Sequence, residues 1–219
     1  MTVGAPRRVL ALYAHPDDAE IWAGGTLLLH RAAGDQLAIC VLTHGDTERA
    51  EEARLGATRL GAALIQYSFP DRRLAADRET IAAVARVLRD LQPDVILTHW
   101  ERDSHPDHVA VWLSTQAAIL DAEIEAHVQA VFWSDTYNGL GTSGAFEPDS
   151  VVDVSAVWRE KLEALDAHSS QHPETYAAMI DRQCGLHGAR AGVNYAEGFR
   201  RAPLFGRVKR PLSTLWDAV

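Results

Sequence analysis

The sequence predicts a single α/β domain over residues 1–219, built as a Rossmann-like three-layer α/β/α sandwich with a mostly parallel sheet. Three observations support this fold class. Apolar runs of strand length alternate with amphipathic stretches of helical length. Glycine and proline fall mainly between these segments, and no repeat or linker interrupts their order. A chain of 219 residues, 47% of them hydrophobic, is also long enough to bury one sizeable core.

Four strands with intervening helices are expected in the first half of the chain. Each strand is a short apolar run, and each helix has apolar residues three or four positions apart. Gly34 and Pro93 are placed to end two of the helices. The expected strands span residues 8–14, 37–43, 64–69 and 94–99, and the expected helices span 21–33, 49–60 and 78–91.

The second half is expected to begin with a helix from Pro106 to about residue 122, because proline suits a first helical turn. The connection at 138–146 is rich in Gly, Ser and Thr. Such a loop is either a mobile lid that selects substrate or an inert connection. Further strands are expected at 130–135 and 150–155, and further helices at 156–168 and 173–187.

The formal net charge of −9 gives no general attraction to phosphate backbones, so no nucleic-acid partner is expected. The N-terminal apolar run, Val9 to Ala14, is too short for a signal sequence or a membrane span. We therefore expect a cytoplasmic protein without membrane contact. Cys40 and Cys184 are far apart in the sequence and form no CxxC motif, which favours two reduced thiols.

Histidine and aspartate residues follow two of the expected strands. His15, Asp17 and Asp18 come directly after the first strand, where a nucleotide-binding domain would carry a GxGxxG fingerprint, and no such fingerprint is present. The segment DSHPDH, residues 103–108, follows the fourth strand. Helix capping explains either cluster alone. Because the carboxyl ends of parallel strands meet at one edge of a sheet, the two clusters together indicate a shared site.

His15, Asp18 and His108 are the expected metal ligands. Two imidazoles and one carboxylate suit a catalytic zinc, which keeps a fourth position for water. Zinc at such a site lowers the pKa of a bound water from about 15.7 towards roughly 7. Asp17 lies beside a ligand without being needed as one, so it is placed to accept the proton of that water as general base. Zn²⁺ is the expected cofactor, although iron or another divalent ion fits the same donors.

Four segments resemble the LmbE/PIG-L deacetylase family in the same order: AHPDDAE at 14–20, HPDH at 105–108, AHSSQ at 167–171 and YAEGF at 195–199. The resemblance spans nearly the whole chain, and AHPDDAE together with HPDH is its specific part. It implies a Rossmann-like fold, zinc, and removal of acetyl groups from N-acetylglucosamine-type substrates. It also implies the same zinc ligands and the same general base.

The resemblance implies further roles within the site. A protonated His105 would donate to the oxyanion, with Asp107 orienting it, and either Asp17 or His105 would protonate the leaving amine. Arg49 would hold substrate hydroxyls or an acid group at the mouth; the alternative is a solvated arginine at a helix start. Some family members carry a tyrosine two positions before the first HPDH histidine, and Asp103 stands there instead. No tyrosine contribution is expected from that position.

The expected function is zinc-dependent hydrolysis of the N-acetyl amide of a small amino-sugar substrate, releasing acetate and a free amine. The alternatives are an amidase acting on a larger amide, such as a thiol conjugate, and a noncatalytic metal- or sugar-binding module. Asp17 argues against the module, because binding alone needs no general base. His44, His99, His168 and Trp22 are expected to have structural roles. Association into a homo-oligomer is left open by the sequence.

Overall fold

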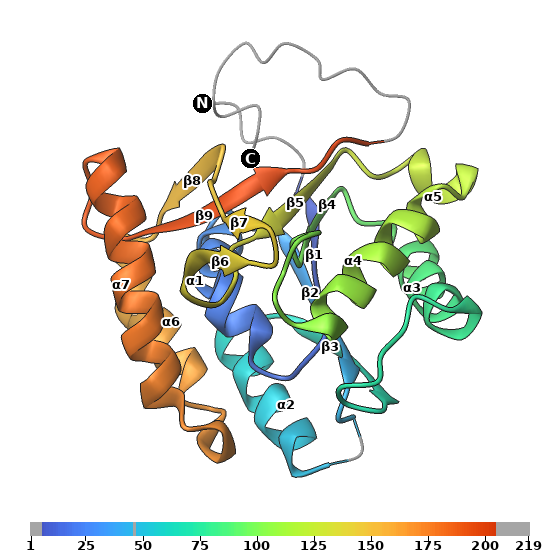
Figure 1. Cartoon of the computed structure of the whole chain (residues 1–219), viewed down its shortest axis with the longest axis horizontal. Helices are drawn as coiled ribbons and strands as arrows, with labels where there is room; N and C mark the ends of the chain where they lie inside the picture. Colours follow the sequence, from blue (N-terminus) through green and yellow to red (C-terminus); the bar gives the residue numbers. More distant parts are fainter. Residues whose placement is uncertain (1–5, 46, 205–219) are drawn as a thin grey trace.

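The strands of the computed structural model are β1 Arg8–Tyr13, β2 Gln36–Thr43, β3 Ala63–Phe69, β4 Val95–Thr98, β5 Ala130–Ser134, β8 Ser150–Asp153 and β9 Ala196–Arg201. The structure describes residues 6–45 and 47–204. These strands form one sheet of seven in the order β3-β2-β1-β4-β5-β9-β8 (Figure 1). Neighbours among β1 to β5 are parallel, whereas β9 runs antiparallel to both β5 and β8. The predicted mostly parallel sheet is confirmed.

Helices cover both faces of this sheet (Figure 1). On one face lie α1 Asp18–Ala32, α2 Glu48–Leu60, α6 Trp158–Leu165 and α7 Pro173–Ala191, and on the other lie α3 Arg78–Leu91, α4 Pro106–Ile119 and α5 Ala122–Glu125. Successive side chains of β1 point to opposite faces and enter two separate hydrophobic clusters. Burial on both faces explains why the parallel strands are continuous apolar runs. The three-layer α/β/α sandwich is therefore confirmed.

Most element boundaries agree with the prediction within a few residues, and α3 agrees at both ends. α1 begins at Asp18 rather than at Ile21, so Asp18 belongs to the helix. The helix predicted at 156–168 is shorter and is flanked by 3-10 turns. The loop 138–146 also contains regular structure. The additional elements are η1 Tyr137–Gly139, β6 Leu140–Gly141, β7 Gly144–Ala145, η2 Ser155–Val157 and η3 Ser169–Gln171.

Two further elements, α5 and β9, are also absent from the prediction. The helix predicted from Pro106 to about residue 122 ends at Ile119, and the single-turn α5 follows it. β9 is not expected from the sequence because a carboxylate interrupts its apolar pattern: Glu197 is buried there as the ion-pair partner of Lys161. A buried charge is expensive unless it is paired, and the pairing is invisible in the sequence.

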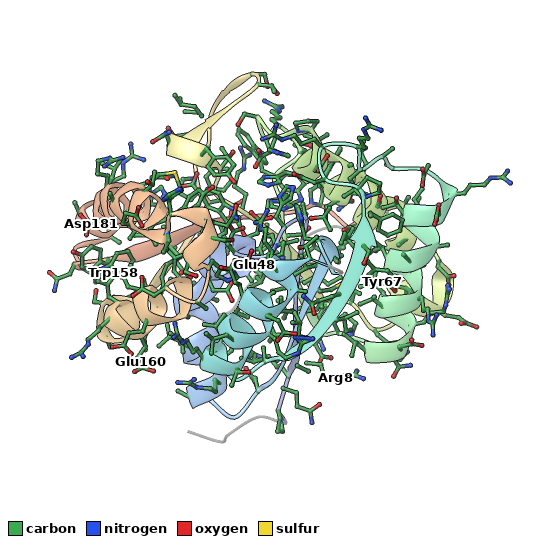
Figure 2. The ribbon with its side chains drawn as sticks, turned by 90° about the horizontal axis from the view of Figure 1, so that it is seen from below. Arg8, Glu48, Tyr67, Trp158, Glu160 and Asp181 are labelled. Atoms are coloured by element: carbon green, nitrogen blue, oxygen red, sulfur yellow. The ribbon has the colours of Figure 1, made fainter. Side chains whose placement is uncertain are left out.

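The strand order places β1 beside β4 where the chain changes direction across the sheet. From β1 the chain adds β2 and β3 on one side, and it then returns to add β4 and β5 on the other. The loops after β1 and β4 diverge at this point, which is where open α/β sheets bind ligands. In Figure 2, Tyr67 of the edge strand β3 lies on the opposite side of the molecule from Trp158 of α6 and Asp181 of α7.

Among the helices of the described residues, none combines the length and the apolar character that crossing a membrane requires.

Candidate metal centre and active site

Three ligand atoms converge at the carboxyl ends of β1 and β4. His15 follows β1, Asp18 begins α1, and His108 lies in the first turn of α4. His15 Nδ1 is 3.3 Å from Asp18 Oδ2 and 3.3 Å from His108 Nε2, and His108 Nε2 is 3.5 Å from Asp18 Oδ1. All three side chains are buried. The structure thus brings together the three residues that the sequence predicts as ligands.

This donor set fits a zinc ion. Ligand atoms about 2.0–2.1 Å from zinc, at tetrahedral angles, lie about 3.3 Å apart. The two imidazole nitrogens are 3.3 Å apart, and each faces its own oxygen of the Asp18 carboxylate, at 3.3 Å for His15 and 3.5 Å for His108. Burial lowers the pKa of His15, but hydrogen bonds to Asp107 and Asp18 outweigh it and raise that pKa to about 10. Burial also disfavours the ionised form of Asp18, but His108 and His99 hold its pKa well below its usual range. The carboxylates around His15 therefore favour a cation at this point, as a divalent-metal site requires.

A carboxylate stands behind each imidazole. Asp107 Oδ2 lies 3.3 Å from His15 Nε2, and the same carboxylate accepts two backbone N–H groups of the loop after β3. Asp103 Oδ2 lies 3.0 Å from His108 Nδ1, in a direction outside the usual hydrogen-bonding range. Carboxylates in such positions orient metal-binding rings and determine which nitrogen faces the ion. His15 accordingly presents Nδ1 to the cluster, and His108 presents Nε2.

His105 departs from the prediction in two respects. The carboxylate of Asp107 contacts His15 and not His105, whose Nδ1 instead accepts the backbone N–H of Asp107 at 3.2 Å. The prediction that the Asp107 carboxylate orients His105 is corrected accordingly. Burial and the neighbouring His108 also lower the pKa of His105, which favours a neutral imidazole over the expected protonated form. With Nδ1 accepting, Nε2–H remains as the donor of this ring.

Asp17 lies beside the ligands with an unusual backbone conformation. Its φ is 100°, in the left-handed region that costs energy for a non-glycine residue. Burial and the adjacent Asp18 carboxylate raise the pKa of Asp17 to about 7, while Arg49 lowers it. Arg49 Nη2 donates to Asp17 Oδ2 at 3.2 Å and to the carbonyl of Pro16 at 2.7 Å. A carboxyl group with a pKa near neutrality suits a general base.

His99 is part of the cluster although no motif spacing points to it. Its ring stacks on that of His108, with centroids 3.6 Å apart and planes 10° from parallel. His99 Nε2 is the ring nitrogen that faces Asp18. It accepts the backbone N–H of Ala14 at 3.0 Å, so this nitrogen already has a hydrogen-bond partner. Burial and His108 lower the pKa of His99 to about 4. His99 therefore supports the ligands as a neutral ring, and its place directly after β4 is the signal that could have found it.

Two further side chains reach the cluster from the ends of β2 and β3. Asp71 Oδ1 lies 3.1 Å from His15 Nε2, and Asp71 Oδ2 lies 3.4 Å from His44 Nε2. In the part of the chain that the structure describes, three overlapping triplets of donor atoms each lie within 4.8 Å, and every triplet includes His15 or His108. The triplets are His15, His105 and His108; Asp18, His99 and His108; and His15, Asp71 and Asp107.

Aromatic rings line one side of the cluster. Trp22 Nε1 donates to Asp18 Oδ1 at 3.2 Å, and the Trp22 ring meets Tyr137 edge-on with centroids 5.1 Å apart. Tyr137 lies 5.7 Å from the His108 ring and 6.3 Å from Tyr176. Burial and the carboxylates of the site raise the pKa of both tyrosines, which keeps them protonated. Neither tyrosine is singled out by the sequence.

The segment AHSSQ supports the site from behind. The carboxylate of Glu52 on α2 accepts hydrogen bonds from both serine hydroxyls and from the backbone N–H of Ser170. His168 Nε2 lies 3.3 Å from Glu20 Oε2 of α1. These contacts tie the segment after α6 to the two helices that carry Asp18 and Arg49.

Fold and site together define an α/β enzyme with a cluster of two histidines and one aspartate at the switch point of a parallel sheet. The chain belongs to the PIG-L family, described as GlcNAc-PI de-N-acetylase, which it matches over residues 10–119, half of its length. The resemblance noted in the motifs is thereby confirmed. The expected enzyme class, a hydrolase that removes an N-acetyl group, is the class of that family.

The relatives of this chain carry two kinds of activity in their names. Diacetylchitobiose deacetylase of Thermococcus kodakarensis is 29% identical, and the match covers 90% of this chain and 84% of the relative. 4-Oxalmesaconate hydratase of Pseudomonas putida is 27% identical over 94% of this chain and 93% of the relative. A conserved protein of Thermus thermophilus has a similar structure, with a TM-score of 0.79, 29% identity and coverage of 94% of this chain and 100% of that protein.

Proposed function

We propose that this chain is a zinc-dependent N-deacetylase that hydrolyses the acetamide of a small amino-sugar substrate, releasing acetate and a free amine. The observation that carries the proposal is the placement of Asp17, a buried carboxyl group with a pKa raised to about 7, directly beside the three converging ligands. The membership in the PIG-L family and the match to diacetylchitobiose deacetylase support the substrate class.

His15, Asp18 and His108 would hold a zinc ion, which would supply a Lewis acid for the acyl oxygen and the attacking water. Asp17 accepts a proton from that water as its oxygen bonds to the acetyl carbon. Asp17 then returns the proton to the nitrogen as the C–N bond breaks, so that the products are acetate and the amine. A pKa near 7 suits both steps, because the group gains and loses the proton readily at neutral pH.

His105 acts on the acyl oxygen in this scheme. As a neutral imidazole it donates its Nε2–H to the oxygen that becomes negative, and it need not lose the proton to do so. A donor fixed in place before the reaction stabilises the transition state without reorganisation. Here Nδ1 of His105 is held by the backbone N–H of Asp107, which fixes the ring. Arg49 donates to Asp17 at 3.2 Å and so keeps this carboxylate in place. We also propose that Arg49 holds substrate hydroxyls or an acid group at the mouth of the site.

Acetate release from a panel of N-acetylated amino sugars tests the proposal. The zinc-loaded wild type should release acetate from at least one of them, and Asp17→Asn should lower the rate about 10²–10⁴-fold, the usual contribution of a general base. Asp90→Asn, which changes an exposed carboxylate on α3, is the matched control and should retain the wild-type rate. Acetate release by Asp17→Asn at the wild-type rate would remove Asp17 from the mechanism.

A hydratase is the second candidate function, and two observations favour it. The match to 4-oxalmesaconate hydratase covers nearly the whole of both chains. Arg72 and Arg73 follow β3 at the site, where the backbone N–H of Arg72 donates to Asp107, and their exposed side chains have no partner among the described residues. Free guanidinium groups suit a carboxylate-bearing substrate. Loss of ultraviolet absorbance from unsaturated dicarboxylates, with no acetate released from any amino sugar, would favour hydration over deacetylation.

A further inference from the structure

The aromatic wall of the site is built from Trp22 and Tyr137. The Tyr137 ring is almost parallel to the His108 imidazole, at 26°, and meets Trp22 edge-on at 78°. Trp22 is itself tied to the metal cluster through its hydrogen bond to Asp18. The two rings therefore stand directly against two of the three proposed ligands, on the side of the sheet that carries α1 and α7.

Burial differs sharply between this wall and the polar side of the site. Trp22 is 3% exposed, whereas the side chains of Arg49, His44 and Asp71 are 15%, 18% and 34% exposed. The charged side is thus the more solvated one, and the aromatic side is formed by the buried Trp22 ring and the half-buried Tyr137 ring. An N-acetylated sugar divides in the same way, because its ring and amine are polar and its acetyl methyl is apolar. The apolar methyl gains most from the aromatic side, where it loses contact with water.

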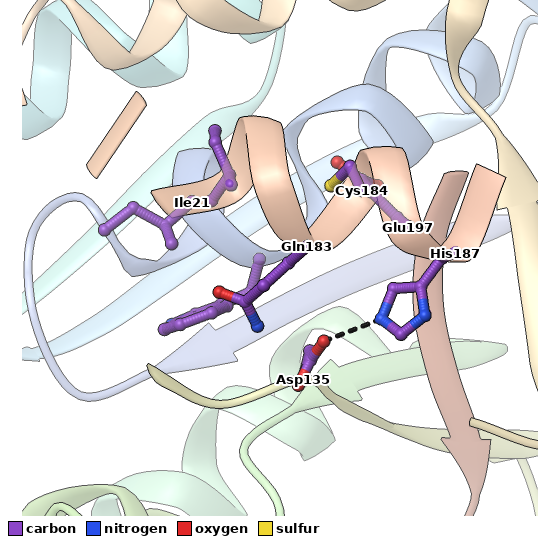
Figure 3. Close-up of a pocket in the computed structure, with 9 residues that line it drawn as sticks. Ile21, Asp135, Gln183, Cys184, His187 and Glu197 are labelled. Atoms are coloured by element: carbon purple, nitrogen blue, oxygen red, sulfur yellow. Dashed lines mark hydrogen bonds and ion pairs between the residues drawn. The ribbon is translucent and has the colours of Figure 1, made fainter. Parts of the chain in front are cut away.

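Tyr137 is held rigidly by contacts from α7. Asp135 Oδ2 lies 2.8 Å from His187 Nε2, and Gln183 Nε2 donates to the carbonyl of Thr136 at 2.9 Å, so the two residues before Tyr137 are both anchored. Figure 3 shows the Asp135–His187 contact beside a small cavity whose lining includes Trp22 and Gln183. The backbone that leads into Tyr137 is thus fixed by α7, which limits how far the ring can move aside for a larger group.

We propose that Tyr137, packed against Trp22 and His108, determines acyl specificity by closing the end of the acyl pocket behind the acetyl methyl. This inference rests on the proposed deacetylase function and names its acyl substrate as acetyl. It also separates that function from an amidase for larger acyl groups. Each added methylene must displace the Tyr137 ring, and discrimination by one methylene in an apolar pocket is about 10–200-fold.

A series of N-acetyl, N-propionyl and N-butyryl glucosamine tests this assignment. The wild type should lose at least about tenfold in kcat/KM with each added methylene. Tyr137→Ala should raise the ratio of butyryl to acetyl hydrolysis at least about tenfold, whereas Tyr137→Phe, which keeps the ring, should retain the wild-type ratio. Tyr137→Leu is a second, less disruptive truncation, and a thermal melt of each variant reports whether it is folded.

Tyr195 provides a matched control tyrosine. Its ring stacks on Trp158 with centroids 4.0 Å apart, and its hydroxyl donates to Asp181 at 3.0 Å. Trp158 and Asp181 lie together at one side of the molecule in Figure 2. Tyr195→Ala should therefore leave the butyryl-to-acetyl ratio unchanged.

Binding of the product carboxylates provides a readout that needs no turnover. Calorimetric titration should show that the ratio of butyrate affinity to acetate affinity is higher in Tyr137→Ala and in Tyr137→Leu than in the wild type. If the wild type releases acetate but both truncations keep the wild-type hydrolysis and binding ratios, the acyl-pocket assignment is wrong and the deacetylase function stands. If the wild type releases no carboxylate from any member of the series, the proposed function itself fails, and the inference fails with it.

Discussion

Replacing Asp103 should weaken metal binding even though Asp103 is not a ligand. Its carboxylate lies 3.0 Å from His108 Nδ1, and both side chains are buried, so in the wild type the ring is oriented by Asp103 and not by solvent. Loss of a carboxylate behind a metal-binding histidine costs about 10–100-fold in metal affinity. That range corresponds to about 1.4–2.8 kcal/mol. Asp103→Asn should fall near its lower end because the amide keeps a partial negative charge on its oxygen and fills the same space behind the ring, and Asp103→Ala should fall near its upper end.

Competition for zinc against a chromophoric chelator measures these affinities directly. The matched control is Asp35→Asn, which alters a partly buried aspartate–histidine contact, Asp35 Oδ2 to His30 Nδ1 at 2.6 Å, at the far end of α1. Its zinc affinity should equal that of the wild type. Equal zinc affinity in the wild type and Asp103→Ala would refute the reasoning, because the orientation of His108 would then not depend on its buried partner.

Three other predictions follow from the same contacts. A chelator should abolish acetate release, and added zinc should restore it. Because Asp17 accepts a proton only when ionised, kcat/KM should fall as the pH drops through the pKa of Asp17. Arg49→Met removes a charge that favours the ionised form, so it should move this acid limb to higher pH, and an unmoved limb would contradict the pairing. Lys161→Met leaves the buried Glu197 carboxylate without its cation and should cost about 3–5 kcal/mol in urea unfolding, whereas Arg159→Met, at an exposed position, should cost almost nothing.

The parallel half of the fold is predictable because its strands are buried on both faces. A strand such as β2 is then a continuous apolar run, and an amphipathic helix such as α3 shows its buried face at regular spacing. β9 lacks this signal, since Glu197 occupies a core position that only the distant Lys161 makes tolerable. The small hairpin of β6 and β7 lies in a segment whose glycine-rich composition indicates only a loop.

The proposed ligands are predictable for a topological reason. His15 and His108 are far apart in the sequence, but each lies beside the end of a parallel strand, and the sheet brings those ends together. The supporting residues lack such a rule. Asp103, which holds His108, and Tyr137, which packs on it, are recognised only by distances that the tertiary structure sets. The protonation state of His105 likewise depends on burial and on neighbouring rings.

The central claim is that His15, Asp18 and His108 hold one metal ion. Zinc content measured by mass spectrometry after dialysis, in the wild type, His108→Ala and His105→Ala, tests it most directly. The account predicts one ion per chain in the wild type and in His105→Ala, and loss of the ion in His108→Ala. One ion per chain retained by His108→Ala, or lost by His105→Ala alone, would contradict it.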